Sequence, residues 1–523
     1  MVKEGKDLKD LEPFDVCVVG AGAAGVTTAW YLQAAGFNVV LADAGREGPG
    51  IGGLGTQVDM VSKRIFYSGE TSGQFDRVAA YNISEPYNNC TGEQEVNVGS
   101  FLTRPWQGYQ SGPWERERTF GGTTAHFGGQ SRPLDPITYD GIPNGVPLRY
   151  PSWPISYQEL EPYISQATDF LRLCDTFDAS DYAVAAGGDV PDLPNFNAEI
   201  YQFLAANDNR AYGDKNFAYR KFGQEGQTIT ESRATVVRNA TLAKMEVEGG
   251  RIKTMHFANL QGGENPGECP SEHYRFTINA KHYVLALGAV ENARQMLLSE
   301  MTNPNIGKYF MCHPYTQSTA ISLSQEFLPQ NQQWADGRII RGQVGNCTTQ
   351  FSNRFIINAE TAEKHNIGRM WLYGGLTQGV YLEMTPNEQS RITLSDKTES
   401  VLGQRLTNIH WELTEDDQRT YEENAALFAA AVKQMNPNVS VNIQPWEAIS
   451  DTLAINGHHL GTTRMSNSAT DGVVDANLRS HDVENLFVAG SSVWTNAGIS
   501  NPTFTIVMLA IRLAEYLGGE LKK

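Results

Sequence analysis

Residues 14–45, FDVCVVGAGAAGVTTAWYLQAAGFNVVLADAG, contain the pattern that decides the fold. A continuous apolar run precedes a glycine-rich turn, as expected of a strand that is buried on both faces of a parallel sheet. The turn leads into a helical segment and then into a second apolar strand that ends at Asp43. This order of strand, glycine turn, helix and strand predicts an α/β fold with a nucleotide-type parallel sheet.

The glycines of this turn each have a physical reason. Gly20 permits the tight turn, Gly22 lets a pyrophosphate approach the backbone, and Gly25 lets the helix pack on the strand. The N–H groups at the start of the helix then stabilise the phosphate charge. Asp43 is placed to accept hydrogen bonds from an adenosine ribose. The motif predicts a dinucleotide site, but it does not by itself distinguish FAD from NAD.

The end of the chain makes that distinction. Residues 483–517, VENLFVAGSSVWTNAGISNPTFTIVMLAIRLAEYL, join a strand that ends in glycine to a loop and then to an apolar helix. A domain that binds only NAD does not need this returning segment, whereas an extended FAD must be held at both ends. We therefore expect the flavin ring near Asn501, Pro502 and Thr503. Pro502 suits the first helical position, and the free N–H groups of that turn stabilise negative charge on the ring.

Composition narrows the function further. At 523 residues the chain exceeds what one compact core usually holds, so we expect two domains. The net charge of -18 argues against nucleic acid as a partner and favours neutral or cationic small molecules. The charged N-terminus lacks the apolar core of a signal peptide, and no apolar run is long enough to span a bilayer. We therefore expect a cytoplasmic location and no membrane insertion.

The six cysteines are widely scattered and show no C-x-x-C spacing. This pattern predicts neither a zinc site nor a disulfide framework, and we expect no metal. Cys17 lies inside an apolar strand and is interpreted as a small core residue.

Glycine-rich, nucleotide-type segments occur at both ends of the chain and near residue 288, with sheet-like segments between them. This distribution predicts one domain assembled from distant segments and a second domain inserted into it. We expect a discontinuous FAD-binding domain and a substrate-binding or lid domain that contains an antiparallel sheet over about residues 340–410. The first comprises residues 1–50, 95–140, 230–312 and 450–523; the second comprises 51–94, 141–229 and 313–449. Ser156 with Glu159, and Thr414 with Asp417, predict helix starts by their capping spacing.

Six segments together carry a family resemblance. They are GAGAAG (20–25), TFGGTTAHFGG (119–129), SWPISYQELEPY (152–163), LALGAVENARQMLL (285–298), GHHLGTTRM (457–465) and NLFVAGSSVWTNAGISNPTFT (485–505). The chain resembles the glucose–methanol–choline (GMC) oxidoreductases, FAD enzymes that oxidise alcohols. The second and third segments look most like the pyranose-oxidase-like and bacterial sugar-oxidoreductase branch. The resemblance implies a Rossmann-like FAD-binding domain of the GR2 type with an inserted α+β substrate domain, and oxidation of a sugar, glycoside or amino-sugar hydroxyl.

The family's H-x-x-G-T pattern identifies His458 as the catalytic base. In an extended pair, adjacent side chains point to opposite faces, so His459 is expected to be a packed neighbour. The second active-site position falls on Asn501, for which a helix N-cap is the alternative role. In the implied reaction, hydride leaves the carbinol carbon for flavin N5 while a neutral imidazole takes the hydroxyl proton. Asn501 would hold the same hydroxyl with its amide.

The resemblance also implies positions that meet the cofactor. His126 follows Gly121, Gly122 and Thr124 at the place where some relatives bond the flavin covalently. The residues around it depart from those relatives, so a covalent bond and simple packing against the ring both stay open. The remaining implied positions are a group at strand ends: Leu242 near adenine, Gly288 and Ala289 near the cofactor, and Gly490 and Ser491 near the pyrophosphate or ribityl chain.

Several alternatives remain at this point. The family also oxidises aliphatic, aryl and sterol alcohols and contains a flavin-bearing lyase, while a redox-inert flavoprotein or a nicotinamide-dependent dehydrogenase would share parts of the pattern. The electron acceptor is not readable from the sequence: oxygen, a quinone or a protein would each serve. The aromatic, glycine-rich segments 64–84 and 105–114 suggest loops that cover the active site, or surface loops without function.

Overall fold

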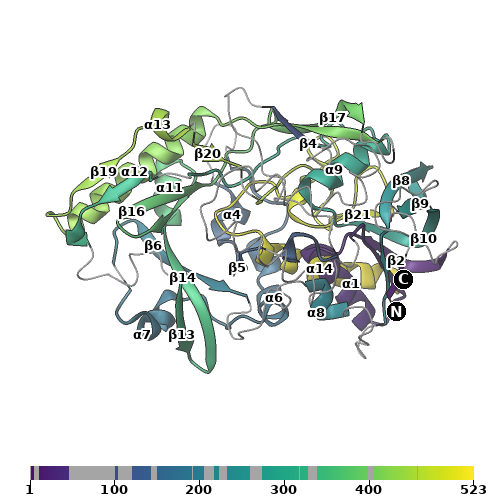
Figure 1. Cartoon of the computed structure of the whole chain (residues 1–523), viewed down its shortest axis with the longest axis horizontal. Coiled ribbons are helices and arrows are strands. Elements are labelled where there is room, and N and C mark those ends of the chain that lie inside the picture. Colours follow the sequence, from purple (N-terminus) through teal and green to yellow (C-terminus); the bar gives the residue numbers. More distant parts are fainter. Residues whose placement is uncertain are drawn as a thin grey trace, which may run out of the picture.

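A computed structural model of the chain describes residues 2–4, 11–45, 100–103, 120–125, 127–142, 150–190, 192–204, 217–222, 233–259, 274–316, 319–327, 339–398, 402, 404–450, 452–455 and 457–523. Two sheets dominate this part of the chain and lie toward opposite ends of the molecule (Figure 1). The two chain termini lie together at the end that contains the first sheet. The predicted α/β class, with an antiparallel sheet in its second half, is confirmed.

The first sheet is parallel at its centre. Its order is β1 (Val2–Glu4), β7 (Thr235–Arg238), β3 (Val39–Ala42), β2 (Leu11–Val19), β10 (Tyr274–Leu285), β9 (Arg251–Asn259) and β8 (Thr241–Glu248), with β21 (Leu486–Val488) beside β10. The pairings from β1 through β10 and between β10 and β21 are parallel, whereas β8 and β9 add an antiparallel edge. These strands come from the beginning, middle and end of the chain, as the glycine-rich segments predict.

The second sheet is antiparallel throughout its described pairings. Its order is β19 (Val441–Ile443), β12 (Ile321–Leu323), β16 (Thr377–Leu382), β15 (Met370–Gly374), β14 (Cys347–Ile357), β6 (Phe196–Phe203) and β5 (Gln130–Ser131). β11 (Tyr315–Thr316) joins β16 to β20 (Leu453–Ala454), and β13 (Ile340–Val344) pairs with β14. A small third sheet contains β17 (Arg391–Thr398), β18 (Arg405–His410) and β4 (Ser100–Thr103).

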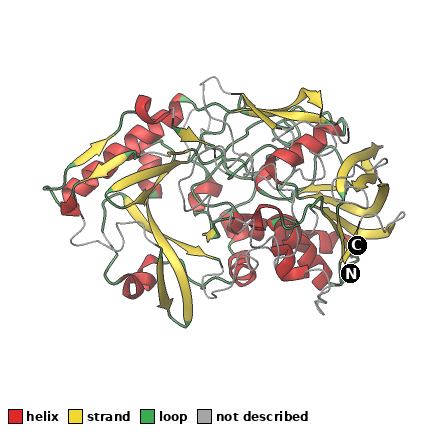
Figure 2. Ribbon diagram, in the orientation of Figure 1, coloured by secondary structure: helices red, strands yellow, loops and turns green. Residues whose placement is uncertain are grey.

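Helices cover both sheets (Figure 2). Beside the parallel sheet, α14 (Thr503–Leu521) packs against α1 (Ala23–Ala34) and α6 (Tyr163–Leu171). The antiparallel sheet contacts the long helix α12 (Glu415–Met435). The other helices are α4 (Pro136–Asp140), α5 (Tyr157–Leu160), α7 (Ala183–Ala186), α8 (Phe217–Phe222), α9 (Gly288–Leu298), α11 (Ala359–His365) and α13 (Trp446–Ser450). Short 3₁₀ turns are η4 (Gly122–Ala125), η5 (Ala179–Tyr182), η7 (Gln325–Phe327) and η8 (Ser491–Val493).

Both predicted capping boxes are confirmed. The Ser156 side chain accepts from the Glu159 N–H, and the Glu159 carboxylate accepts from the Ser156 N–H, at the start of α5. Thr414 and Asp417 form the same reciprocal arrangement at the start of α12. Each pair satisfies backbone donors that a helix N-terminus otherwise leaves without partners.

One expectation about the cysteines is wrong. Cys174, after α6, and Cys347, at the start of β14, form a disulfide with a Cα–Cα distance of 5.7 Å. The two residues are 173 positions apart, so no local spacing rule finds them. Cys17 is buried and free, as expected. Disulfides are rare in cytosolic proteins, so this pair does not favour the cytoplasmic location.

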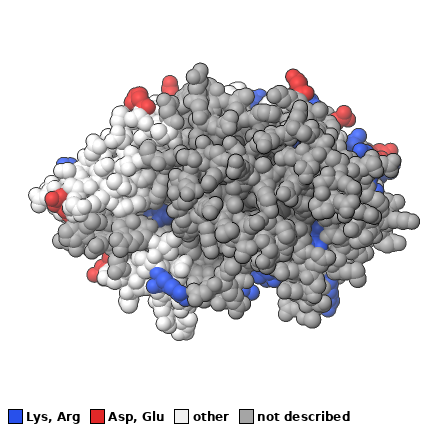
Figure 3. Space-filling view, viewed as in Figure 1, with Lys and Arg blue, Asp and Glu red and all other residues white. Residues whose placement is uncertain are grey.

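Charged side chains of the described residues lie at several places on one face of the molecule. Figure 3 shows acidic and basic side chains distributed around the outline of this face rather than gathered over one element. None of the helices in the described ranges is long and apolar enough to cross a membrane. Within the same ranges, no group of three His, Cys, Asp or Glu side chains is placed to hold a metal ion.

Candidate active site

The glycine turn after β2 is closed so tightly that two of its glycines are obligatory. A Cβ on Gly20, whose φ is +102°, would lie 2.5 Å from the Ala286 carbonyl oxygen. A Cβ on Gly25 would lie 1.8 Å from the Gly20 carbonyl oxygen, so the first turn of α1 packs directly on the strand end. Gly22 is different, because a Cβ there meets nothing within 4 Å. Its missing side chain leaves open space at the helix start, which fits a ligand's approach to the backbone.

Asp43, which follows the neighbouring strand β3, holds this turn through hydrogen bonds. Its carboxylate accepts the Ala21 N–H at 2.6 Å and the Gly45 N–H at 2.7 Å. Burial raises the pKa of Asp43 to about 6, against the lowering effect of these two hydrogen bonds. The Asp43 carbonyl also accepts the Ala240 N–H, which brings the start of β8 and Leu242 to the same corner. Hydrogen bonding to an adenosine ribose stays a prediction for Asp43.

The predicted cofactor residues gather along one edge of the parallel sheet. Gly20, Asp43, Gly288 and Gly490 follow the carboxyl ends of β2, β3, β10 and β21, which are neighbours in the sheet. Open α/β sheets bind their ligands at this edge. Gly288 and Gly490 have φ values of +81° and +109°, and a Cβ on Gly288 meets no atom within 4 Å. These backbone positions fit a dinucleotide that runs along the edge.

The Gly-Gly segment lies beside the fingerprint turn. A Cβ on Gly122 would come within 3.6 Å of the Gly22 Cα. The Thr124 hydroxyl donates to the Gly121 carbonyl at 2.6 Å and holds the turn η4. His126, the candidate for a covalent bond, and the segments 64–84 and 105–114 lie outside the described residues.

We predict that Gly25→Ala prevents FAD retention. The added methyl has to displace the Gly20 carbonyl, and overpacking of this kind costs about 1–3 kcal/mol while it distorts the turn. The absorbance ratio at 450 and 280 nm and the thermal unfolding midpoint measure both effects. Gly519→Ala is the matched control, because it lies in α14 with nothing within 4 Å of its Cβ. That variant is expected to keep its flavin and to gain up to about 1 kcal/mol. A yellow, stable Gly25→Ala protein would contradict the prediction.

At the far end of the same edge, the structure brings His458 and Asn501 together. The Asn501 amide donates from Nδ2 to His458 Nε2 at 3.1 Å. The alternative role of Asn501 as a helix N-cap is wrong, since α14 begins at Thr503 with Pro502 as its N-cap residue. Pro502 is therefore one position earlier than predicted, and its carbonyl accepts the first helical hydrogen bond, from Ile506.

His459 has the neighbouring role that the sequence suggests. Its side chain is buried and its ring lies 5.4 Å from the ring of Phe310. Its carbonyl accepts a hydrogen bond from the Ser491 hydroxyl at 2.6 Å. Ser491 also accepts the Gly461 N–H through its own carbonyl. The predicted residue Ser491 thus holds the backbone at His459 and at Gly461, where the chain leaves the histidine pair. Ala289, another predicted residue, accepts the Thr462 hydroxyl through its carbonyl.

A third histidine, which the sequence interpretation missed, contacts His458. His313 is fully buried, and its Nδ1 lies 2.9 Å from His458 Nδ1. Its Nε2 lies 2.9 Å from the Gly498 carbonyl oxygen and 3.3 Å from that of Ala497. The three groups form a chain from the backbone of the 497–498 loop to His313, then to His458, and then to Asn501.

This chain fixes the position of every ring proton. Carbonyl oxygens only accept, so His313 Nε2 carries a hydrogen and donates it. Burial lowers the pKa of His313 to about 4, so the ring is neutral near pH 7 and its Nδ1 is an acceptor. His458 Nδ1 therefore carries the hydrogen between the two rings. Burial, with smaller effects of His313 and His459, lowers the pKa of His458 well below its ordinary value, so the ring is neutral and the lone pair of its Nε2 accepts the Asn501 N–H.

The loop that supplies these carbonyls is clamped from several elements. Asn496 donates to the Thr138 and Pro151 carbonyls, each at 2.8 Å, and the Tyr201 hydroxyl donates to the Ile499 carbonyl at 2.9 Å. The Ser500 hydroxyl donates to the Arg132 carbonyl at 3.0 Å. The loop is thus tied both to α4 and to the antiparallel sheet.

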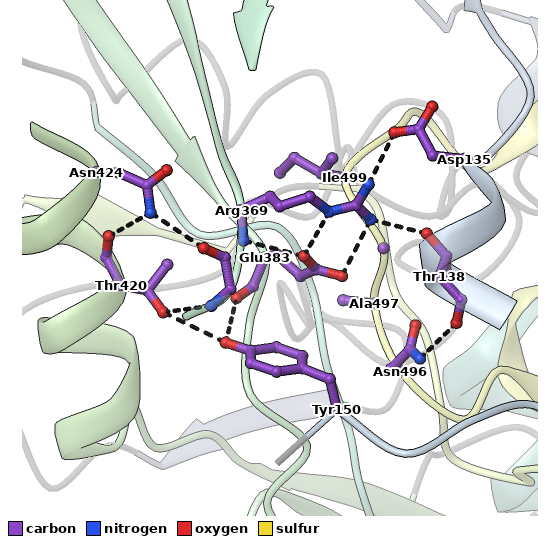
Figure 4. Close-up of polar contacts among 12 residues, drawn as sticks. Asp135, Thr138, Tyr150, Arg369, Glu383, Thr420, Asn424, Asn496, Ala497 and Ile499 are labelled. Carbon is purple, nitrogen blue, oxygen red and sulfur yellow. Dashed lines mark hydrogen bonds and ion pairs between the residues drawn. The ribbon is translucent and has the colours of Figure 1, made fainter. Parts of the chain in front are cut away.

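A buried ion-pair network supports this clamp (Figure 4). Arg369 donates to Glu383 at 3.0 Å, to Asp135 at 2.7 Å and to the Thr138 hydroxyl at 2.7 Å. Thr138 in turn accepts the Asn496 amide through its carbonyl, so the network ends at the loop of residues 496–500. Breaking a buried pair of this kind costs several kcal/mol, which makes the arrangement rigid.

The buried His313 gives a testable pH dependence. Its pKa of about 4 in the folded protein lies below the ordinary value of 6.5, so the unfolded chain binds more protons between these pH values. The contribution of His313 to the free energy of unfolding is therefore fully present above pH 6.5, and it falls by about 3 kcal/mol on acidification to pH 4. Urea unfolding of the parent and of His313→Gln across this range measures the effect, together with the accompanying change at His458, since glutamine does not titrate.

The difference between the two proteins is the informative quantity. Burial raises the pKa values of Asp43 and Asp417 to about 6, and a raised carboxyl pKa makes stability fall as the pH rises. These carboxyls oppose His313 in the parent, but they contribute equally to the variant. If the free energies of unfolding of the parent and of His313→Gln differ by the same amount at pH 7 and at pH 4.5, the low pKa of His313 is contradicted.

Comparisons with known proteins come from three directions. A family model described as GMC oxidoreductase matches residues 386–510, and one described as FAD dependent oxidoreductase matches residues 15–81. The chain is 21% identical to the fructose dehydrogenase large subunit of Gluconobacter japonicus, over 97% of this chain and 98% of that protein. It is 24% identical to 2-methyl-1,2-propanediol dehydrogenase of Mycolicibacterium austroafricanum, over 96% and 95% of the two chains.

Solved structures share the fold. A pyridoxine 4-oxidase from Mesorbium loti superposes with a TM-score of 0.54 and 13% identity, over 96% of this chain and 99% of that one. A formate oxidase from Aspergillus oryzae RIB40 gives a TM-score of 0.58 and 13% identity, over 98% and 100%. The likeness extends over nearly the whole of each chain, so both the parallel and the antiparallel regions have counterparts there.

Proposed function

Because the chain belongs to the GMC family, whose members use FAD to oxidise alcohols, we propose that it oxidises a hydroxyl of a sugar, glycoside or amino sugar to a carbonyl. We assign His458 as the base and Asn501 as the residue that holds the reacting hydroxyl. The observation that carries this assignment is that His458 Nε2 carries no hydrogen and accepts one from Asn501, a state that the hydrogen-bond chain through His313 fixes.

The residues that would hold FAD are those along the sheet edge. The turn at Gly20, Gly22 and Gly25, with Asp43, would hold the pyrophosphate and ribose, Leu242 would meet adenine, and Gly490 with Ser491 would meet the ribityl chain. The start of α14, at Asn501, Pro502 and Thr503, would face the ring. When bound, FAD supplies the acceptor for the hydride of the alcohol carbon, which carries both electrons of the oxidation.

The protein's own part of the chemistry is proton transfer. When the alcohol binds, its hydroxyl takes the place of the Asn501 amide at His458 Nε2. His458 Nε2 then accepts the hydroxyl proton, while an N–H of Asn501 donates to the hydroxyl oxygen and orients the C–H bond. The ring then carries a positive charge, and His313 Nδ1 continues to accept its other N–H. Because His313 is held by backbone carbonyls, the base keeps its orientation throughout.

Aromatic rings next to the base support a sugar as substrate. The Tyr381 ring lies 6.4 Å from that of His458, and Trp371 lies 4.4 Å from Tyr381. Tyr315 stacks on Tyr381 at 5.3 Å. Aromatic faces of this kind pack against the apolar C–H surfaces of pyranose rings. The fructose dehydrogenase is named for a sugar, whereas the other curated relative is named for a small branched diol, which is the second candidate substrate class.

One experiment separates these possibilities. Oxidised protein is mixed anaerobically with a panel of sugars, glycosides, amino sugars and small diols, and bleaching of the flavin band near 450 nm is followed. We expect sugars to bleach it, and bleaching by the diols alone would favour the second class. If no alcohol bleaches a flavin that dithionite reduces, a lyase or a redox-inert flavoprotein replaces the proposal. Reoxidation by air, by a quinone and by a protein acceptor then identifies the electron acceptor.

Two further assignments belong to the proposal. The first is the division into an FAD-binding domain (1–50, 95–140, 230–312, 450–523) and a substrate domain (51–94, 141–229, 313–449). The strands of the parallel sheet support it, because all of them lie in the first set of ranges, whereas β5 and β20 of the antiparallel sheet also lie there. Whether His126 bonds the flavin is decided by acid precipitation. Yellow colour that stays in the pellet indicates a covalent bond, and colour in the supernatant indicates packing alone.

A further inference from the structure

One face of the antiparallel sheet is turned toward the base. Directly paired residues of an antiparallel sheet project to the same face. Ile356 pairs with Trp371, Trp371 pairs with Tyr381, and Tyr381 pairs with Tyr315. Arg354 stands two residues before Ile356 on β14, so it projects to the same face as these side chains.

Distances connect this face to His458. The Tyr381 ring is 6.4 Å from the His458 ring, and the Trp371 ring is 6.0 Å from that of His313. On the same face, the Arg354 guanidinium lies 5.8 Å from the centre of the Tyr201 ring, and that ring lies 5.3 Å from the ring of Trp371. Trp371 in turn lies 4.4 Å from Tyr381, so a row of adjacent aromatic rings connects the arginine to the base.

Two arginines near this face have opposite surroundings. Arg132 and Arg354 lie 5.9 and 5.8 Å from the centre of the same ring, that of Tyr201. Arg132 is neutralised by Asp135 at 2.8 Å and Glu199 at 2.5 Å. Arg354 is only 8% exposed, and its one hydrogen bond to a described residue goes to the Asn353 carbonyl at 2.7 Å. No carboxylate of the described residues lies within ion-pair distance of it.

An unpaired buried charge is costly to maintain. Burial lowers the pKa of Arg354, whereas the two carboxylates raise the pKa of Arg132. Buried arginines are normally paired, and apolar replacements of similar size are neutral or stabilising. The neighbouring Tyr381 hydroxyl also has no hydrogen-bond partner among the described residues. A cation and a hydroxyl donor on the face that is turned toward the base are therefore both available to an anionic acceptor.

We propose that Arg354, together with the Tyr381 hydroxyl, binds a carboxylate group of the substrate, so that the alcohol oxidised is a hydroxy acid such as a uronate. The inference rests on the proposed alcohol oxidation and names its substrate class. A planar guanidinium binds a carboxylate through two parallel hydrogen bonds. One unpaired positive charge also matches one carboxylate better than a phosphate ester, which carries between one and two negative charges at neutral pH.

The test compares acidic and neutral sugars in matched pairs on the holoenzyme. The pairs are D-glucuronate with D-glucose, D-galacturonate with D-galactose and D-mannuronate with D-mannose, and D-glucose 6-phosphate is added. Equilibrium Kd values come from the perturbation of the oxidised flavin spectrum and from ligand-dependent thermal midpoints, and anaerobic bleaching gives the reduction rate. We expect at least one uronate to bind about 10- to 100-fold more tightly than its neutral partner.

Arg354→Met is expected to abolish this preference, so that the uronate and its neutral partner have about equal Kd values. Arg354→Lys is expected to be intermediate, because lysine keeps the charge without the planar guanidinium. Equal binding of acid and neutral members in every pair would overturn the proposal. Preferential binding of the sugar phosphate would overturn it too, as would an Arg354→Met variant that weakens both members of a pair equally.

The thermal midpoint without ligand separates a binding role from a structural one. We expect Arg354→Met to unfold at the same temperature as the parent or higher, because it removes an unpaired charge. Arg132→Met is the matched control and is expected to unfold lower, because it removes the ion-pair partner of the largely buried Glu199 and leaves Asp135 with Arg369 alone. A lower midpoint for Arg354→Met would overturn the inference. If neutral alcohols bleach the flavin and uronates are no better, only this inference fails; if no alcohol bleaches it, the proposed function fails first.

Discussion

His458→Ala is expected to slow the reduction of the flavin by its best substrate by about 10²- to 10⁴-fold. The variant loses the Nε2 lone pair, and among the described residues no other basic nitrogen contacts Asn501. The hydroxyl proton then has to pass to water, which this buried site restricts. Anaerobic stopped-flow absorbance at 450 nm gives the rate constant directly, without contributions from reoxidation.

His459→Ala is the matched control for His458. It is the adjacent histidine, it is also buried, and its side chain packs on Phe310 rather than on Asn501. We expect its reduction rate to stay within about threefold of the parent, since its structural role is carried by the carbonyl that Ser491 holds. Added imidazole is expected to restore part of the rate in His458→Ala and none in the control. Parent-like reduction by His458→Ala would exclude it as the base.

His313→Phe is expected to slow flavin reduction by about 10²- to 10⁴-fold, although His313 does not itself take the proton. Phenylalanine accepts no hydrogen bond, so His458 Nδ1 loses the acceptor that holds its hydrogen 2.9 Å away. The ring is then free to move its hydrogen to Nε2, which removes the lone pair from the catalytic position. The substrate Kd is expected to change less than the rate constant.

His313→Gln separates this positioning role from mere packing. A glutamine amide still has an N–H group to donate to the Gly498 carbonyl and an oxygen to accept from His458. We expect its reduction rate to stay within about tenfold of that of the parent. We also expect its free energy of unfolding to lack the fall between pH 6.5 and pH 4 that His313 causes in the parent. If phenylalanine and glutamine give the same rate, His313 acts only by filling space.

The sequence predicts the local parts of this site. His458 stands in an H-x-x-G-T pattern and Asn501 lies just before an apolar helix, so both can be found from neighbouring residues. The glycine turn is equally local: the 1.8 Å approach at Gly25 follows from the strand, turn and helix that the pattern already contains. Capping boxes are short-range as well, and both of those predicted are present.

What sequence reasoning missed depends on strand pairing. His313 lies 145 residues before His458, and it reaches the site because β11 pairs with β16 and β20. Cys174 and Cys347 meet for the same kind of reason. A weak signal existed for Arg354, a charge inside the apolar run FSNRFIIN, and for His313, inside KYFMCHPYT. Without the pairing register, neither residue can be assigned to a particular surface.

The groups that orient His313 are main-chain oxygens, which no point substitution deletes. Only a change in the path of the chain moves them. Gly498 is required for this path, because its φ is +60° and a Cβ would lie 2.5 Å from a Leu134 methyl. A mutant library directed at residues 497–500 would therefore yield mostly inactive scaffolds. Libraries meant to change substrate preference are better directed at Tyr315, Tyr373 and Tyr381. Their side chains can be varied without replacing His458, His313 or the carbonyls that hold His313.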